Sequence, residues 1–262
     1  SHHYIMGFQK EISDNFSLEI ETYYKDYSNL YSYDYFFYTG LQPENYTDDG
    51  EPIYQSTAGL FNRGNGHSYG LEFLLRKNSG PVTGWASYTL SRAVQKIEGV
   101  NQSENFVPRH DRTHMLNLIG NIDIKNSLRQ LRSVDYNRDR TTWRLGIGVV
   151  YASGQPITTT SSIYVTNPLP DQNFYSGYNL YPTERNNFRL PPYFRFDLSL
   201  TMEKRYKSWT LAPYLQIFNV TNRKNVWFID YEDEIQGDKL IQNVDTFSMF
   251  PILPTIGVTM TF

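Results

Sequence analysis

Apolar and polar residues alternate along most of the chain, and this period of two indicates β-strands. The alternation is clearest at 192–204, where one face carries Phe194, Phe196, Leu198, Leu200 and Met202. The other face of that segment carries Arg195, Asp197, Ser199, Thr201 and Glu203. The pattern predicts nine strands, at 3–12, 16–30, 66–77, 83–96, 112–124, 141–157, 192–204, 209–228 and 251–262. Because helical periodicity is nearly absent, we expect an all-β, antiparallel fold.

The predicted connections alternate in length. Those at 13–15, 78–82 and 205–208 are short, whereas those at 31–65, 97–111, 158–190 and 229–250 are long. The connection 125–140 is an exception to the alternation. Tight turns at one end and long loops at the other are typical of an outer-membrane β-barrel. The predicted strands also exceed the usual five or six residues, as membrane-spanning strands do.

The two faces of the clear strands differ in charge. A lipid-facing Arg or Lys at the bilayer midplane costs about 2–4 kcal/mol, so the charged face must point into the barrel. We therefore expect Glu72, Arg76, Arg195, Asp197 and Glu203 to face the lumen. Aromatic residues near strand ends, among them Trp85, Trp143, Trp209 and Phe262, fit girdles at the two membrane interfaces.

Composition narrows the alternatives. The formal net charge of −3 argues against a nucleic-acid partner, and the absence of cysteine excludes disulfides and thiolate metal sites. The mean hydropathy of −0.54 remains compatible with a membrane barrel, whose strands average to a polar composition. Because a bacterial single-chain barrel has an even number of strands, nine strands indicate either that the pattern misses one strand or that residues 1–262 form only part of one barrel domain, and we expect the second.

Several stretches resemble the C-terminal half of a TonB-dependent outer-membrane receptor of the kind found in Bacteroidetes-type bacteria. They are HHYIMGFQKEISDNFSLEIETYYKDYSNLY, GNGHSYGLEFLLRK, VPRHDRTHMLNL, LPPYFRFDLSLTMEKR, LQIFNVTNRKNVWFIDYE and FPILPTIGVTMTF, and their order and spacing span the chain. The resemblance implies a 22-stranded barrel with a plugged lumen, of which this chain supplies the last nine strands. It places the protein in the outer membrane of a Gram-negative bacterium.

The resemblance also implies partners. The earlier strands and the plug domain would belong to the N-terminal remainder of the same receptor, with several lumen residues touching the plug, and TonB would engage that remainder. The barrel-assembly machinery would read Phe262 as the outward aromatic that ends the last strand. Membrane lipid would surround the barrel, and a surface lipoprotein is a further candidate partner.

The long connections carry the candidate substrate-binding residues, which are Tyr31, Tyr33, Tyr35, Tyr38, Trp227 and Tyr231. Aromatic faces stack on sugars, flat chelates or peptide side chains. The alternative is that these rings extend an interfacial girdle into a loop.

Acidic residues gather in the same connections. Asp230, Glu232 and Glu234 are candidate oxygen ligands for calcium, although a solvated acidic loop explains them equally. Because the connections 31–65 and 229–250 are rich in Asp and Glu, we expect an acidic mouth that favours a neutral or cationic solute.

The stretch RHDRTH offers His110, Asp111 and His114 to a rim enzyme, but that chemistry also needs a positioned nucleophile or water and a partner carboxylate, and we expect no catalytic site. The expected function is TonB-dependent import of a scarce solute across the outer membrane. The alternative is a passive porin, or a surface adhesin built on a barrel, without energy coupling. The identity of the solute stays open among siderophore, cobalamin, glycan and peptide.

Overall fold

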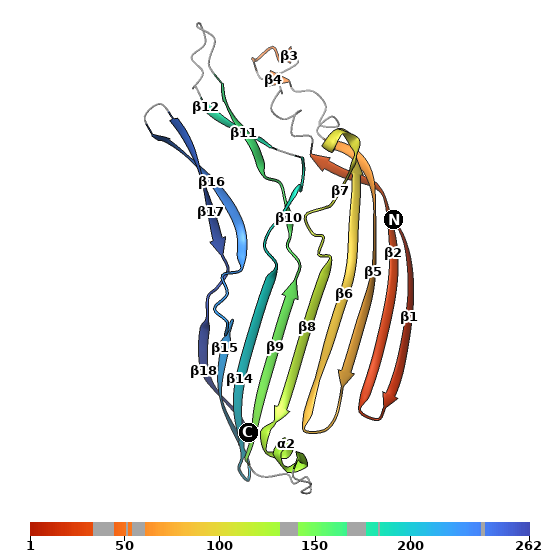
Figure 1. The fold of residues 1–262 in the computed structure, drawn as a ribbon, viewed down its shortest axis with the longest axis vertical. Helices are drawn as coiled ribbons and strands as arrows, with labels where there is room; N and C mark the ends of the chain where they lie inside the picture. The colour runs from red at the N-terminus through yellow and green to blue at the C-terminus, as the bar shows by residue number, and fades with distance from the viewer. Residues whose placement is uncertain are drawn as a thin grey trace.

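The computed structural model describes residues 1–33, 45–50, 52–53, 61–131, 141–166, 177–182, 184–236 and 239–262. Its main feature is one antiparallel sheet of ten strands (Figure 1). Nine of them lie side by side in chain order: β1 (His2–Ser13), β2 (Phe16–Tyr33), β5 (Phe61–Lys77), β6 (Val82–Ile97), β8 (His114–Asp123), β9 (Thr141–Ala152), β14 (Tyr193–Arg205), β15 (Thr210–Phe218) and β18 (Leu253–Thr261). The tenth, β7 (Asn105–Phe106), pairs with the end of β6. The predicted all-β, antiparallel fold is confirmed.

One predicted strand is wrong. The segment 209–228 is not continuous, because β15 ends at Phe218 and β16 (Val226–Gln236) begins after a turn. Asn219 and Asn222 have positive φ in that turn, a conformation that asparagine tolerates better than most residues. The prediction at 141–157 is also too long, since β9 ends at Ala152.

Shorter elements occupy the connections. They are β3 (Asn45–Tyr46) with β4 (Pro52–Ile53), β10 (Pro156–Ile157) with β13 (Phe188–Arg189), β11 (Thr160–Thr166) with β12 (Gly177–Pro182), and β16 with β17 (Lys239–Ser248). A 3₁₀ turn, η2, spans Val100–Ser103. The hairpins β11–β12 and β16–β17 and the β3–β4 pair lie at one end of the sheet, and the tight turns lie at the other (Figure 1). The long connections therefore share one end, which we call the rim.

The connection that breaks the alternation of lengths begins as a helix. α2 (Ile124–Leu131) follows β8 at the tight-turn end (Figure 1). Its first turn is capped by Asp123, which accepts hydrogen bonds from the backbone N–H of Asn126 (3.1 Å) and from its side-chain amide (2.8 Å). Among the described residues, no helix is long and apolar enough to cross a membrane.

The strand register joins the apolar faces of all nine strands into one surface. Tyr4 pairs with Tyr24, and Tyr24 pairs with Tyr69. At the other side of the sheet, Leu215 pairs with both Leu200 and Ile256. Directly paired residues lie on the same face of an antiparallel sheet, so each alternating strand adds a row to this apolar surface.

The register also assigns the faces of 83–96, which the sequence pattern leaves ambiguous. Ala86, Tyr88 and Leu90 join the apolar face. Trp85 pairs with Arg76 on the charged face, so its assignment to an interfacial girdle is wrong.

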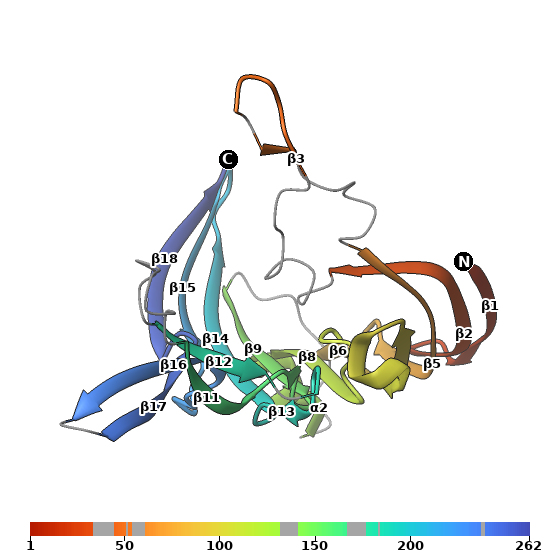
Figure 2. The ribbon, with the colours of Figure 1, turned by 90° about the horizontal axis from the view of Figure 1, so that it is seen from above.

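The sheet curves into an open arc when seen from the rim (Figure 2). Side chains converge on the concave face of such an arc and spread apart on the convex face. Carboxylates of the charged face are well covered, since the side chains of Glu203 and Asp197 are 17% and 20% exposed, although those of their partners Arg144 and Arg195 are 53% and 29% exposed. On the apolar face, Leu118 and Tyr69 of interior strands are 38% and 48% exposed. We infer that the charged face is concave and the apolar face convex.

Buried apolar residues are few and lie at the rim. Among the described residues they are Ala93, Ile97, Phe106 and Leu190. The sheet thus has its packed core where the connections fold over β6, while its convex apolar face is left uncovered by the described chain.

Candidate functional site at the rim

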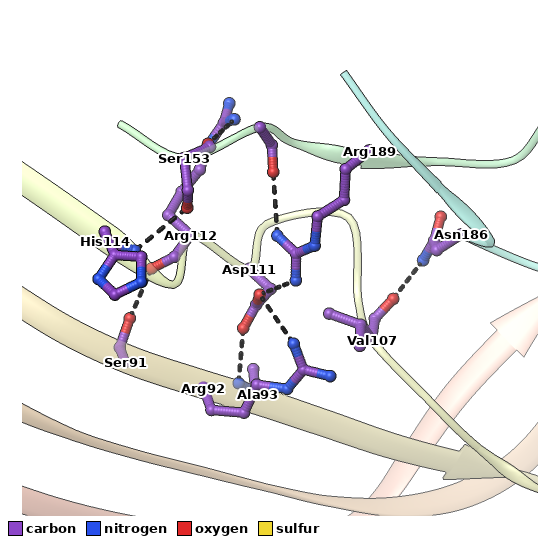
Figure 3. Close-up of polar contacts among 11 residues, drawn as sticks. Ser91, Arg92, Ala93, Val107, Asp111, Arg112, His114, Ser153, Asn186 and Arg189 are labelled. Atoms are coloured by element: carbon purple, nitrogen blue, oxygen red, sulfur yellow. Dashed lines mark hydrogen bonds and ion pairs between the residues drawn. The ribbon is translucent and has the colours of Figure 1, made fainter. Parts of the chain in front are cut away.

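Asp111 organises the rim next to β6 (Figure 3). Its side chain is 1% exposed. One carboxylate oxygen accepts a hydrogen bond from the backbone N–H of Ala93 at 2.7 Å, and the other pairs with the guanidinium of Arg189 at 2.6 Å. Arg92 lies 3.9 Å from the same oxygen. The buried carboxylate is therefore matched by charge and by donors, as a buried ion requires.

This arrangement follows from the lengths of the strands. β6 runs past the start of β8, so its last residues need other partners for their backbone groups. The N–H of Ser91 donates to the carbonyl of Thr113 at 3.0 Å, and the N–H of Ala93 donates to the side chain of Asp111. Further along β6, Gln95 and Lys96 pair with β7. The segment after η2 thus completes the edge of β6.

Arg112 fixes the same segment to β9. Its two terminal nitrogens donate to the carbonyl of Ser153 and to Oε1 of Gln155, each at 2.9 Å. Burial lowers the pKa of Arg112, the nearby Arg189 lowers it further, and Asp111 opposes both effects. Positive charge is therefore in excess at this point of the rim.

A second clamp joins η2 to the segment before β13. The backbone N–H of Arg185 donates to the side-chain oxygen of Asn101 at 2.7 Å, and the amide of Asn101 donates to the carbonyl of Arg185 at 3.2 Å. The guanidinium of Arg185 contacts Ser32 on β2 and lies 5.8 Å from the ring centroid of Phe106. Asn186 donates to the carbonyl of Val107 at 2.8 Å. Residues that are 79 to 153 positions apart in the sequence thus contact each other and hold the rim together.

A cavity of about 460 Å³ opens between these segments. Its walls come from the end of β2, the end of β6, the segment 106–110, the residues after β10, the segment before β13 and the start of β16. The lining residues are Tyr31, Ser32, Gln95, Ile97, Phe106, Pro108, Arg109, His110, Ile157, Thr158, Arg185, Asn186, Trp227, Phe228, Ile229 and Tyr231.

Three of the predicted substrate-binding residues, Tyr31, Trp227 and Tyr231, line this cavity together. Tyr33 ends β2, but its side chain lies outside the described residues, and so do Tyr35 and Tyr38. Sequence reasoning missed Phe106, Arg109 and Arg185. Phe106 and Arg109 lie in or next to the stretch VPRHDRTHMLNL, which we used for the family resemblance and for candidate catalytic groups but not for solute binding.

The charges of the lining differ from those of the connections around it. Among the described lining residues, the charged side chains are Arg109 and Arg185, with His110 beside them. The acidic residues Asp48 and Asp49 are exposed and do not line the cavity. The expectation of an acidic mouth stays a prediction, because most acidic side chains of the connections 31–65 and 229–250 lie outside the described residues.

The calcium candidates do not gather into a site in the described part of the chain, where no three acidic or histidine side chains lie at a metal-binding spacing. Asp230 accepts a hydrogen bond from the backbone N–H of Tyr231 at 3.0 Å. Glu232 and Glu234 belong to β16, and their side chains lie outside the described residues. Calcium binding there stays a prediction.

The predicted lumen residues share the concave face, and four of the five form ion pairs along it. Arg76 lies 3.5 Å from Glu19 on the neighbouring strand, and Glu203 lies 3.4 Å from Arg144. Arg195 and Asp197 pair at 2.9 Å within β14. Glu72 pairs with Glu21 and Thr89 in the register of the same face. Phe262, the predicted assembly signal, has a fully exposed side chain.

Asn219 holds the turn that carries Trp227 to the cavity. Its side-chain amide donates to the carbonyls of Arg223 (3.0 Å) and Phe250 (3.1 Å), and its backbone N–H donates to Asp197 at 2.9 Å. Asn225 makes two further bonds to the backbone of Phe194, at 2.8 and 2.9 Å. This network orients the start of β16 towards the rim.

The catalytic alternative has little geometric support. Asp111 is occupied by Arg189 and Ala93, and Nδ1 of His114 hydrogen-bonds the hydroxyl of Tyr88 at 2.8 Å. The rim offers recognition groups, namely rings, hydroxyls, amides and guanidinium groups, around one cavity. Comparisons of the chain with protein-family models, with curated proteins and with solved structures give no match.

Proposed function

We propose that this chain forms nine strands of a 22-stranded barrel in a Gram-negative outer membrane, and that the barrel belongs to a TonB-dependent transporter. The observation that carries the proposal is the sheet with two opposite faces. Its convex face is apolar across all nine strands, and its concave face holds the ion pairs. A soluble sheet would need a second layer over the apolar face, whereas lipid covers it in a barrel.

The height of the apolar face supports this membrane placement. On β5, His67 and Lys77 bound the apolar residues Tyr69, Leu71, Phe73 and Leu75 on the convex face. Ten residue steps span about 33 Å at ~3.3 Å each. A strand tilt of about 40° reduces that to about 25 Å, the height of the apolar band of outer-membrane barrels.

The edges of the sheet support membership of a larger barrel. β1 and β18 each have one edge without a strand partner in the described part of the chain. In a nine-strand antiparallel row the first and last strands run in the same direction, so they cannot close on each other antiparallel. Closure needs an odd number of added strands, and a 22-stranded barrel supplies thirteen. In this proposal those strands and a plug come from the N-terminal remainder of the receptor.

Active import fits the rim cavity and the concave face. The cavity gathers Tyr31, Trp227 and Tyr231 for capture of a solute. The paired charges of the concave face, among them Arg195, Asp197 and Glu203, offer a polar surface on which a plug can move. In this proposal TonB supplies the energy, the barrel-assembly machinery inserts the chain, and a surface lipoprotein is a candidate partner at the rim. A passive porin or an adhesin is the alternative.

The test is uptake by cells that carry the full-length protein. Deletion strains, with and without the gene restored, would be grown with siderophore-bound iron, cobalamin, oligosaccharides or peptides as the limiting nutrient. The proposal expects a growth advantage from the gene that disappears when TonB is also deleted. Uptake that persists without TonB would instead identify a porin.

A further inference from the structure

We propose that the rim cavity binds an anionic solute that carries a ring, with a carboxylate or phosphate group held by Arg109 and the ring stacked on Trp227 or Tyr31. The inference rests on the proposed function only in taking the transported solute as the occupant. It names the chemical class of that solute, and it reverses the expectation that the acidic connections favour a cation.

The first argument is the charge of the lining. The described lining residues include two arginines and a histidine and no carboxylate. The guanidinium of Arg185 is already engaged by the hydroxyl of Ser32 and the ring of Phe106. Arg109 is exposed and makes no ion pair or hydrogen bond with the part of the chain that the structure describes. It is therefore the cation left for a ligand, and its planar guanidinium binds oxyanions in a bidentate manner.

The second argument is the surroundings of the lining. Asp111 follows Arg109 by two residues, but the carboxylate of Asp111 forms ion pairs with Arg189 and Arg92. Arg112 stands close to Arg189, and burial together with this neighbouring guanidinium lowers the pKa of Arg112. The buried carboxylate of Asp111 therefore does not neutralise the positive charge of Arg109 at the cavity.

The third argument is the shape of the available groups. Trp227 is 62% exposed although it lines the cavity, so much of its side chain is open to a ligand. Tyr31 is also exposed, and Phe228 and Tyr231 continue the aromatic wall. Ser32, Gln95, Thr158 and Asn186 add neutral hydrogen-bonding groups. A cavity of 460 Å³ lies within the range of small-molecule sites, about 300–1,000 Å³.

Charged thiol reagents test the field of the cavity without knowledge of the solute. Thr158→Cys places a small reporter in the lining and keeps Arg109 and every ring. The purified full-length protein, with any cysteine outside residues 1–262 removed, would react with an anionic and a cationic methanethiosulfonate. Each rate would be divided by the rate of the same reagent with 2-mercaptoethanol. We expect the anionic reagent to be favoured by roughly threefold to tenfold, and less at high salt.

Matched variants assign the field to Arg109. In the Thr158→Cys background, Arg109→Gln should lower the preference for the anionic reagent severalfold, and Arg109→Lys should retain most of it. Lys224→Gln removes the same charge from an exposed position outside the lining and should change nothing. A preference for the cationic reagent, or an equal effect of Lys224→Gln and Arg109→Gln, would overturn the anionic assignment.

A second measurement tests the ring. Benzoate carries both an anion and a ring, acetate only the anion, and benzyl alcohol only the ring. We expect benzoate to slow labelling of Thr158→Cys at lower concentration than either of the other two. Equal protection by acetate would remove the ring from the proposal. None of these labelling results depends on TonB, so a failed uptake test and a failed labelling test are distinguishable.

Discussion

Arginine substitutions at two adjacent residues of β15 separate a lipid-facing surface from a solvated one. Leu215 and Gln216 are both exposed in the structure, and they lie on opposite faces of the sheet. Leu215 pairs with Leu200 and Ile256 on the convex face, whereas Gln216 pairs with Ser199 and Thr255 on the concave face. In water, an exposed arginine at either position would cost little.

The expected cost follows from depth in the bilayer. Leu215 is four residues from Leu211 at the tight-turn side and four from Asn219 at the rim side, or about 13 Å along the strand in each direction. Leu215 therefore lies near the middle of the apolar band. A lipid-facing arginine costs about 2–4 kcal/mol at the midplane and about 0–1 kcal/mol near an interface. Leu215→Arg should lower the free energy of unfolding by about 3 kcal/mol, and Leu211→Arg by less than about 1 kcal/mol.

The assay is urea unfolding of the full-length protein in phosphatidylcholine vesicles, followed by tryptophan fluorescence. Gln216→Arg is the matched control and should leave the free energy of unfolding within about 0.5 kcal/mol of the parent. A Gln216→Arg variant as unstable as Leu215→Arg would refute the assignment of faces. Equal losses for Leu211→Arg and Leu215→Arg would refute the bilayer, because a protein layer over this face has no such depth profile.

Three further substitutions probe the rim and the concave face. Asp111→Ala leaves Arg189 and the N–H of Ala93 without their partner. Amide hydrogen exchange of residues 91–96 should therefore become faster, by an amount that corresponds to about 2 kcal/mol. The exchange rates of Asp111→Asn should lie between those of Asp111→Ala and the parent. Asn219→Ala removes the two hydrogen bonds that the side-chain amide donates to Arg223 and Phe250. It should lower the urea midpoint of unfolding more than Asn222→Ala does. Asn222 also has a positive φ, but its side chain accepts a single hydrogen bond, from Ile252. A Cβ on Gly257 would clash with the ring of Tyr214, so Gly257→Ala should cost about 1–3 kcal/mol. The second change Tyr214→Leu should restore much of that loss, and an unchanged double variant would contradict the clash.

The strands are predictable because their signal is local. The polarity of each residue in 192–204 predicts which face of the sheet its side chain is on. The observed register pairs apolar residues with apolar residues of the neighbouring strands, so the same face is apolar across the sheet. The break at Asn219 is not visible in the same way. Leu215 and Ile217 continue the apolar pattern up to Asn219, and only the hydrogen bonds of this buried asparagine show that the chain turns there.

The cavity is less predictable because its walls meet only through tertiary contacts. Tyr31, Trp227 and Tyr231 are predicted as binding residues because aromatic residues in the connections can be read directly from the sequence. Arg185 reaches the site from another connection through Asn101 and Phe106. Loop composition indicated an acidic mouth, but which residues line the cavity depends on how the loops fold over β6, and composition carries no such information.

The strictly sequential strand order has a consequence for dividing the molecule. Each long strand of the sheet pairs with its neighbours along the row, and β6 pairs in addition with the short strand β7. A cut between β8 and β9 therefore leaves every other ladder of the sheet intact within one fragment or the other. The fragments must re-form one ladder, which joins Met115–Asp123 to Arg144–Ala152, together with the rim contacts of Asp111 with Arg189, Arg112 with Ser153 and Asn101 with Arg185. Co-expressed halves are thus a natural starting point for a split reporter, in which a signal appears only when that one ladder closes.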